Sequence, residues 1–387
     1  MHKKNGFRIV LLLIIALSVF RSIYSYRLTY DYSLQKRAEI AEQNRPDIHV
    51  ASVWIKSDRG FIDGVTLAVE EVNKQGIMLR SGEKTVKARI VLHEFDDSTE
   101  QSSQQSRLSI AADHKIVAVV GHSSSASAIP ASITYEYNGV LFISPVATAP
   151  LLTEHGFKYT FSIIPSEIFF VSKIIEFCKE RNWHKLLVLY SRNVYGMNLY
   201  QRFASQLEPP LEIVEDKSFF VEHLDYHLDY NELIYELMKK DFDAVVLAAA
   251  EEDAAKMIKQ LRAMGVNKPI IGGDGLDTLQ IWDWSEKTAN QTYVTSVFPG
   301  HNDFDNKFKQ AYGIDGSYSA YQGYESIKVL ADAIQKTGTS NPIQVASTLK
   351  YNYKQGYGGY VFKSNGLASN KKIYIKQIVD GRFVLIE

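Results

Sequence analysis

The sequence predicts an α/β fold in which two Rossmann-like lobes, each with a parallel sheet, lie on either side of one cleft. Short apolar runs alternate with amphipathic segments from residue 48 onward, which is typical of a parallel sheet covered by helices. The alternation occurs once before Pro165 and again after it, so two such units are expected. Two apolar runs of the first unit also end in loops of small hydroxyl residues, where α/β folds of this class place ligands.

The unit before Pro165 contains apolar runs of strand length joined by helical segments. The segment over 60–75 is amphipathic, and Val65 and Val72 are among its apolar positions. A helical segment also separates the last two apolar runs, and such a crossover predicts that the strands are parallel. The expected elements are strands over 49–55, 88–95, 116–120 and 140–143, with helices over 60–75 and 102–113.

The unit after Pro165 repeats this alternation, followed by a last helix, a loop rich in Gly and Tyr, and a closing strand. The expected helices cover 168–180, 196–207, 230–240, 253–264 and 319–337. The expected strands cover 185–190, 211–220, 244–249, 269–271 and 372–379.

The hydroxyl loops follow the strands over 116–120 and 140–143. Because parallel neighbours end at the same edge of a sheet, the hydroxyls and backbone N–H groups of these loops are expected to face one crevice. Such a group suits a small anion such as a carboxylate. The alternative is that these side chains only cap the helices that follow. The residues concerned are Ser123, Ser124, Ser125 and Thr148.

An ordered set of residues around these loops carries a family resemblance. Its members are Gly121-His122, the serines that follow, Pro130-Ala131-Ser132, Tyr135-Glu136, Gly139, Ile143-Ser144-Pro145 and Ala147-Thr148. The chain resembles the type I periplasmic binding proteins, closest to the leucine/isoleucine/valine-binding branch that serves ABC transporters. The resemblance extends more weakly from about Ile48 to near the C-terminus.

The resemblance implies that the chain crosses between the lobes three times and thereby forms a hinge. The crossings are expected near Pro165, Phe298-Pro299 and Asn370-Lys371, where turn residues occur. Lobe 1 then comprises residues 48–166 and 298–370, and lobe 2 comprises 167–297 and 371–387.

For lobe 1 the resemblance assigns Ser125 and Thr148 to the carboxylate of the ligand, with Ser124 in the same loop. It assigns the carbonyl oxygen of Val146 to the ammonium group of the ligand. Charge-assisted hydrogen bonds of this kind suit a carboxylate and an ammonium group that have been removed from water.

For lobe 2 the resemblance points to Tyr195, an aromatic residue before Gly196 that would close over the ligand. It also points to Asp274, which stands where the branched-chain relatives have a glutamate that pairs with the ammonium group. The chain departs from the family at Ser191-Arg192, where an acidic residue is common. The alternatives are a tyrosine packed on a turn and an aspartate in an ordinary Gly-Asp-Gly turn.

A further departure falls at Ala250 and Glu251, where relatives often carry an aromatic residue at the end of the preceding strand. The small side chain of Ala250 opens space, and Glu251 adds negative charge. We therefore expect plain aliphatic amino acids to bind poorly, and a larger, polar or cationic ligand to bind better. The alternative is that Glu251 faces solvent at the start of a helix, where the helix dipole favours acidic residues.

Enzyme and cofactor signatures are weak. The run from Gly121 to Ser125 begins like a G-x-S-x-G nucleophile elbow but lacks its last glycine. His223 and His227 have a spacing that suits a metal on a helix, yet they are expected in the loop before a helix that Asp229 caps. The lone Cys178 is expected in the core. We expect no enzyme activity, no cofactor and no metal.

Charge and the N-terminus bear on partners and location. The 387 residues carry a net charge of −1, which argues against a nucleic-acid partner. Basic residues precede an uncharged stretch over 9–20, so residues 1–25 are expected to be a signal peptide or signal anchor, and 26–47 a polar tether. The cleavage site is weak, with Ser25 the best small residue.

These features predict an exported monomer in the periplasm, or held at the membrane by an uncleaved N-terminus, that delivers an amino acid-like ligand to an inner-membrane ABC permease. The alternative is a sensory module of the same fold that acts with a signalling partner.

Overall fold

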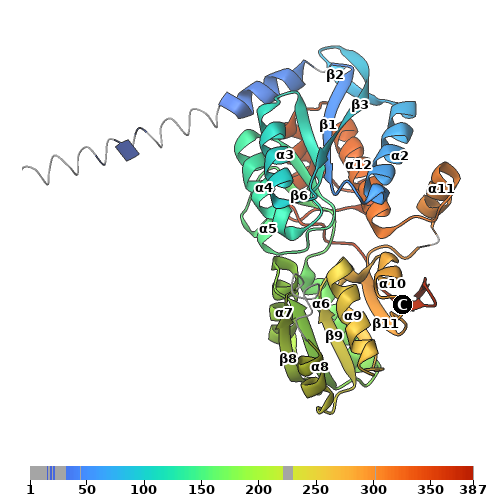
Figure 1. Cartoon of the computed structure of the whole chain (residues 1–387). Coiled ribbons are helices and arrows are strands. Elements are labelled where there is room, and N and C mark those ends of the chain that lie inside the picture. Colours follow the sequence, from blue (N-terminus) through green and yellow to red (C-terminus); the bar gives the residue numbers. More distant parts are fainter. Residues whose placement is uncertain are drawn as a thin grey trace, which may run out of the picture.

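The computed structural model describes residues 15, 18, 19, 21, 32–43, 45–220, 230–300 and 302–386. Within this part the chain forms two α/β lobes, one above the other in Figure 1, each built on its own sheet. Lobe 1 contains β1–β6, α2–α5 and α11–α13, and lobe 2 contains β7–β13 and α6–α10. The predicted fold class is therefore confirmed.

The sheet of lobe 1 has six strands among the described residues, in the order β2-β3-β1-β4-β5-β6. All neighbours are parallel except β2 and β3, which form an antiparallel hairpin around Gly82. The strands are β1 (Asp47–Trp54), β2 (Ile77–Ser81), β3 (Lys84–Asp96), β4 (Ile116–Gly121), β5 (Leu141–Ser144) and β6 (Thr160–Ser162).

Helices cover both faces of this sheet, and their apolar sides form two cores. One core includes Phe61 and Ile327, and the other includes Tyr135 and Phe142. The backbones of α2 and α12 approach closely, since a Cβ on Gly64 would lie 1.9 Å from the Ala320 carbonyl oxygen. The helices are α2 (Arg59–Gln75), α3 (Glu100–Ala112), α4 (Ser125–Asn138), α5 (Leu151–Glu154), α11 (Asp303–Tyr312), α12 (Tyr318–Thr337) and α13 (Pro342–Ser347).

The sheet of lobe 2 has seven strands among the described residues, in the order β13-β12-β11-β10-β9-β7-β8. Its last two strands in the chain, β12 and β13, are antiparallel to their neighbours, and the rest are parallel. The strands are β7 (Lys185–Ser191), β8 (Glu212–Phe219), β9 (Ala244–Ala248), β10 (Ile270–Gly272), β11 (Thr292–Ser296), β12 (Tyr374–Val379) and β13 (Arg382–Leu385). The helices are α6 (Glu167–Glu180), α7 (Val194–Gln206), α8 (Tyr230–Met238), α9 (Glu251–Ala263) and α10 (Gln280–Trp284).

The chain crosses between the lobes after β6, after β11 and before β12. The third crossing is fixed at both ends by lysines, of which Lys371 is partly buried and Lys376 is buried. Lys371 donates to Glu325 Oε2 at 3.1 Å and to Tyr321 at 3.2 Å, both on α12 of lobe 1. Lys376 pairs with Asp277 inside lobe 2. The backbone between these two lysines therefore connects two firmly held points.

Residues 32–42 form a helix that packs on lobe 1, so this part of the expected tether is not a free linker (Figure 1). The side chain of Arg37, which is fully buried, holds this helix against lobe 1. Its guanidinium donates to the carbonyl oxygens of Asn138 at 3.0 Å and Asp113 at 2.8 Å, and also to those of Ile116 and Ala111. These carbonyls lie at the ends of α4 and α3 and at the start of β4, so one side chain caps two helices.

The expected signal segment over 1–25 lies almost entirely outside the described residues. Among the residues that the structure does describe, none belongs to a helix with the length and hydrophobicity needed to span a bilayer.

Candidate ligand-binding site between the lobes

The hydroxyl loops of lobe 1 meet as expected. Ser125 is the first residue of α4, and the backbone N–H of Ala149 approaches its Oγ at 3.4 Å, which brings Ser125 next to Thr148. Both side chains are buried, with 3% and 1% of their surface exposed. Thr148 Oγ1 has no hydrogen-bond partner. A buried hydroxyl without a partner is costly unless a ligand completes it.

Ser124 plays a different part. Its exposed hydroxyl accepts from the backbone N–H of Ser127 at 3.3 Å, so it caps α4 as the alternative interpretation expected. The backbone of Val146 lies between β5 and Thr148, and its side chain packs on the core of lobe 1.

A buried network fixes the serine loop. Asp97 accepts hydrogen bonds from the backbone N–H and the hydroxyl of Ser123, at 2.7 and 2.8 Å, and from Ser127 at 2.8 Å. The ring of His122 bridges Asp97 and the hydroxyl of Tyr135, at 3.0 and 2.9 Å. Burial alone would raise the pKa of Asp97, but the bonds from His122 and Ser123 outweigh it and lower that pKa. The ionised carboxylate therefore holds the loop in place.

On lobe 2 the structure brings Tyr195 and Asp274 together. The Tyr195 hydroxyl donates to Asp274 Oδ1 at 3.0 Å and accepts from the backbone N–H of Gly275 at 3.0 Å. The tyrosine ring lies so close to this loop that a Cβ on Gly273 would come within 2.3 Å of its hydroxyl. The Gly-Asp-Gly sequence is thus needed for the loop to pack under Tyr195.

Asp274 also connects the lobes. Tyr318, the first residue of α12 in lobe 1, donates to Asp274 Oδ2 at 3.1 Å. Burial raises the pKa of Asp274 to about 7, although the two tyrosine hydroxyls act in the opposite direction. The resemblance did not indicate Tyr318.

Glu167 is a second acidic residue that the sequence analysis missed. It begins α6 directly after the first crossing, and its backbone N–H donates to the Thr148 carbonyl at 2.9 Å. Its side chain is 1% exposed and neither carboxyl oxygen has a hydrogen-bond partner. The nearest cation is Arg202, whose Nε lies 4.0 Å away. Burial raises the pKa of Glu167 to about 8, and Asp274 and Glu154 raise it further against the effect of Arg202.

Ala250 and Glu251 lie beside this group. Ala250 precedes α9 and contacts the Gly275 loop, since a Cβ on Gly275 would lie 2.7 Å from the Ala250 Cβ and 2.9 Å from Tyr195 Cε1. Glu251 is exposed and lines a cavity of about 540 Å³ whose other walls belong to lobe 1, Ser124 among them. Although Glu251 is exposed, the surrounding protein partly desolvates its carboxyl group, and this, followed by the charge of Asp58, raises its pKa.

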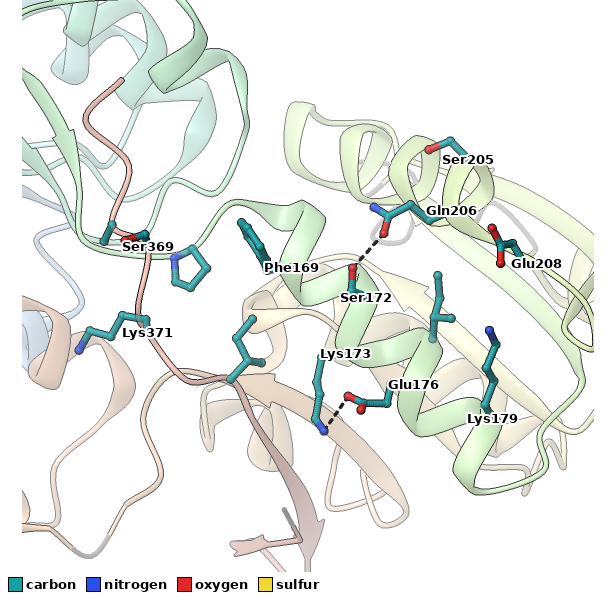
Figure 2. A pocket seen from close by; sticks show the side chains of 14 residues that line it. Phe169, Ser172, Lys173, Glu176, Lys179, Ser205, Gln206, Glu208, Ser369 and Lys371 are labelled. Carbon is teal, nitrogen blue, oxygen red and sulfur yellow. Dashed lines mark hydrogen bonds and ion pairs between the residues drawn. The ribbon is translucent and has the colours of Figure 1, made fainter. Parts of the chain in front are cut away.

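A second cavity, of about 990 Å³, lies along α6 and the third crossing (Figure 2). Its side chains pair with one another: Ser172 donates to Gln206 at 3.0 Å, and Lys173 donates to Glu176 at 3.0 Å. None of the predicted site residues lines it. It marks the hinge side of the molecule rather than the candidate site.

The features that suggested other chemistry find structural explanations or remain untested. Ser123 is held by Asp97, and the ring nitrogens of His122 are taken by Asp97 and Tyr135, so this histidine does not activate the serine. Cys178 is buried in the core of lobe 2. His223 and His227 lie outside the described residues. Within the described ranges, no cluster of three or more His, Cys, Asp or Glu could hold a metal ion.

Comparison with known proteins agrees with this architecture. A family model described as periplasmic binding protein matches residues 56–382. The Leu/Ile/Val-binding protein BraC3 of Rhizobium johnstonii is 26% identical over 74% of this chain and 77% of its own length. The leucine-, isoleucine-, valine-, threonine- and alanine-binding protein of Pseudomonas aeruginosa is 25% identical over 79% of this chain and 82% of its own length.

Solved structures share the fold. An ABC transporter substrate-binding protein from Desulfitobacterium hafniense, in complex with Leu, superposes with a TM-score of 0.73 at 25% identity, over 88% of this chain and 100% of that one. LivJ of Streptococcus pneumoniae, in complex with isoleucine, gives a TM-score of 0.76 at 23% identity, over 88% and 99% of the two chains. Two lobes, three crossings and the matched residues lead to one conclusion: the chain belongs to the type I periplasmic binding proteins, in the family of the Leu/Ile/Val-binding proteins, whose members bind solutes and are not enzymes.

Proposed function

We propose that the protein binds a small amino acid-like ligand between its lobes and presents it to an inner-membrane ABC permease. The main observation in support of this proposal is that a hydroxyl on one lobe and a carboxyl group on the other both lack hydrogen-bond partners. Thr148 Oγ1 and both carboxyl oxygens of Glu167 are buried without hydrogen-bond partners, with Arg202 Nε 4.0 Å from Glu167, and one backbone hydrogen bond joins Thr148 and Glu167. A zwitterion would satisfy both.

The ligand carboxylate would bind the hydroxyls of Ser125 and Thr148, together with the backbone N–H groups at the start of α4. This helix begins at Ser125, and its N-terminus adds a favourable partial positive charge. Each hydrogen bond to a charged group contributes about 1.5–3 kcal/mol.

The ligand ammonium would bind Glu167 and the carbonyl of Val146, with Asp274 close by. Tyr195 would close over the ligand from lobe 2, where Ala250 leaves room beside it. The relatives named above bind leucine, isoleucine or valine by their titles, which supports an amino acid as the ligand class.

The test is calorimetry of the double variant Ser125→Ala/Thr148→Ala against amino acids first identified by a thermal-shift screen. Loss of two charge-assisted bonds should weaken binding by about 100-fold or more. The matched control is Thr85→Ala/Ser109→Ala, which removes two exposed hydroxyls of β3 and α3. Equal affinities for the two double variants would remove the pocket from this site.

Export and delivery are separate parts of the proposal. A fusion of residues 1–47 to a reporter that is active only outside the cytoplasm should give signal. The clamp of Arg37 on lobe 1 supports a second arrangement, a receptor held close to the membrane by its N-terminus and read by a signalling partner. Recovery of the full-length protein in the soluble periplasmic fraction would exclude this arrangement.

A further inference from the structure

The cavity of about 540 Å³ beside the candidate site has no assigned role. It lies at the carboxyl ends of β1, β3 and β4, where their loops lead into the helices of lobe 1, and Glu251 of lobe 2 completes its wall. Its volume lies within the range of small-molecule pockets. Ser124, which precedes Ser125 in the chain, lines the cavity.

Ten of the thirteen residues that line this cavity are polar or charged. Six of its thirteen lining residues carry a hydroxyl, while Ile55, Ala126 and Pro130 are its apolar residues. Ser103 is only 2% exposed, and its hydroxyl forms no hydrogen bond of standard geometry. It still lies near enough to Asp97 to help lower the pKa of that carboxyl group. A branched aliphatic side chain would leave such groups without partners, at a cost.

The charge of the cavity is negative. Asp97, Glu100 and Glu251 line it, and Arg107 is the one basic residue among its described walls. The carboxylate of Asp97 is already bound by His122 and the serine loop, yet its charge remains. Arg107 balances at most one of the three carboxylates.

We infer that this cavity receives the side chain of the ligand, and that the ligand is an amino acid with a long polar side chain ending in a cation that pairs with Glu251. The inference rests on the proposed function, since the ligand backbone must occupy the pocket at Ser125 and Thr148. Glu251 lies on the opposite lobe from the other walls, so pairing with it also helps to draw the lobes together.

The test is calorimetric titration of arginine, lysine, leucine and glutamate into the full chain and into Glu251→Gln. Arginine or lysine should bind more tightly than leucine or glutamate to the unmodified protein. Loss of the charged partner in Glu251→Gln should weaken that binding by about 10- to 100-fold. The matched control is Glu252→Gln, which removes a neighbouring carboxylate that pairs with Lys256 at 3.1 Å and does not line the cavity. It should leave the affinity unchanged.

Three results would overturn the inference: tighter binding of leucine or glutamate than of both cations, equal cation affinities in Glu251→Gln and the unmodified protein, or equal losses in the two variants. Each leaves the proposed function standing, because an amino acid still binds. Failure of all four amino acids to bind would instead count against both the inference and an amino acid as the ligand class.

Discussion

The hydroxyl of Tyr318 lies 3.1 Å from Asp274 Oδ2, and this hydrogen bond joins the two lobes across the candidate site. Tyr195 already occupies the other oxygen of the same carboxyl group. Asp274 is thus held from both lobes. This arrangement of the two lobes therefore has a contact of its own, to which a bound ligand would add.

Replacing this tyrosine, Tyr318→Phe, should therefore favour the open form of the ligand-free protein. A hydrogen bond to a carboxyl group contributes about 1.5–3 kcal/mol when the group is charged, which shifts an open–closed equilibrium by about 10- to 100-fold. Small-angle scattering of ligand-free protein should give a larger radius of gyration for the variant. Tyr351→Phe, which alters an exposed tyrosine, is the control. Identical radii for Tyr318→Phe and the unmodified protein would show that the bond does not hold the lobes.

A second prediction concerns the loop over Gly273–Gly275. In Gly275→Ala the new Cβ would meet Ala250 Cβ at 2.7 Å and Tyr195 Cε1 at 2.9 Å, so the loop must shift. Overpacking of this kind costs about 1–3 kcal/mol, and here it displaces Asp274 and Tyr195 from the site. We expect a lower unfolding temperature and weaker ligand binding. The double variant Gly275→Ala/Ala250→Gly should recover part of both losses, and no recovery would place the strain elsewhere.

Much of the fold could be predicted from the sequence because fully buried parallel strands are continuous apolar runs. β4, β5 and β9 are of this kind, and every residue in each of them is buried. The first half of β3 and the whole of β6 gave no such signal. The former is a polar edge hairpin, and the latter has only three residues.

The residues of the candidate site also fall into two groups, those that the sequence could predict and those that it could not. Ser125 and Thr148 follow apolar strands, so the topology alone brings them to one edge. Glu167 looks in sequence like an ordinary acidic residue in a first helical turn, where the helix dipole favours it. Its importance comes from burial between the lobes, which depends on contacts with residues far along the chain. Tyr318 escaped notice because its partner Asp274 belongs to the other lobe.

Arg37 gave no signal either, since it stands in a polar, charged stretch. Replacing it, Arg37→Met, keeps much of the side-chain volume but leaves buried carbonyls at the ends of α3 and α4 without a donor. Burial lowers the pKa of Arg37 to about 10, so the residue is charged at neutral pH. Each orphaned group costs about 1–3 kcal/mol, and a loss of at least about 3 kcal/mol is expected in urea unfolding.

The matched control for this change is Lys36→Met. Lys36 is the exposed neighbour of Arg37 on the same helix and lies 3.8 Å from Glu39, so its loss should alter stability little. A stability of Arg37→Met equal to that of the control would show that the helix over 32–42 contributes nothing to lobe 1.

The buried carboxyl of Glu167 makes stability depend on pH in a defined direction. Burial raises its pKa from 4.5 to about 8 in the folded protein, whereas the unfolded chain ionises near the ordinary value. The folded state therefore retains a proton that the unfolded state loses. The contribution of Glu167 to the free energy of unfolding is fully present below about pH 4.5 and is lost progressively as the pH rises toward 8. In Glu167→Gln this loss cannot occur, so the variant should gain stability relative to the unmodified protein between pH 5 and 8.

The measurement is urea unfolding of ligand-free protein at several pH values, taken as the difference between unmodified protein and variant so that other titrating groups cancel. Each pKa unit corresponds to about 1.4 kcal/mol, so the difference should be readily resolved. Glu176→Gln, on the exposed side of α6, should show no such pH-dependent gain. A flat difference for Glu167→Gln would mean that Glu167 is ionised in the ligand-free protein. It would then need a partner other than Arg202, whose Nε lies 4.0 Å away.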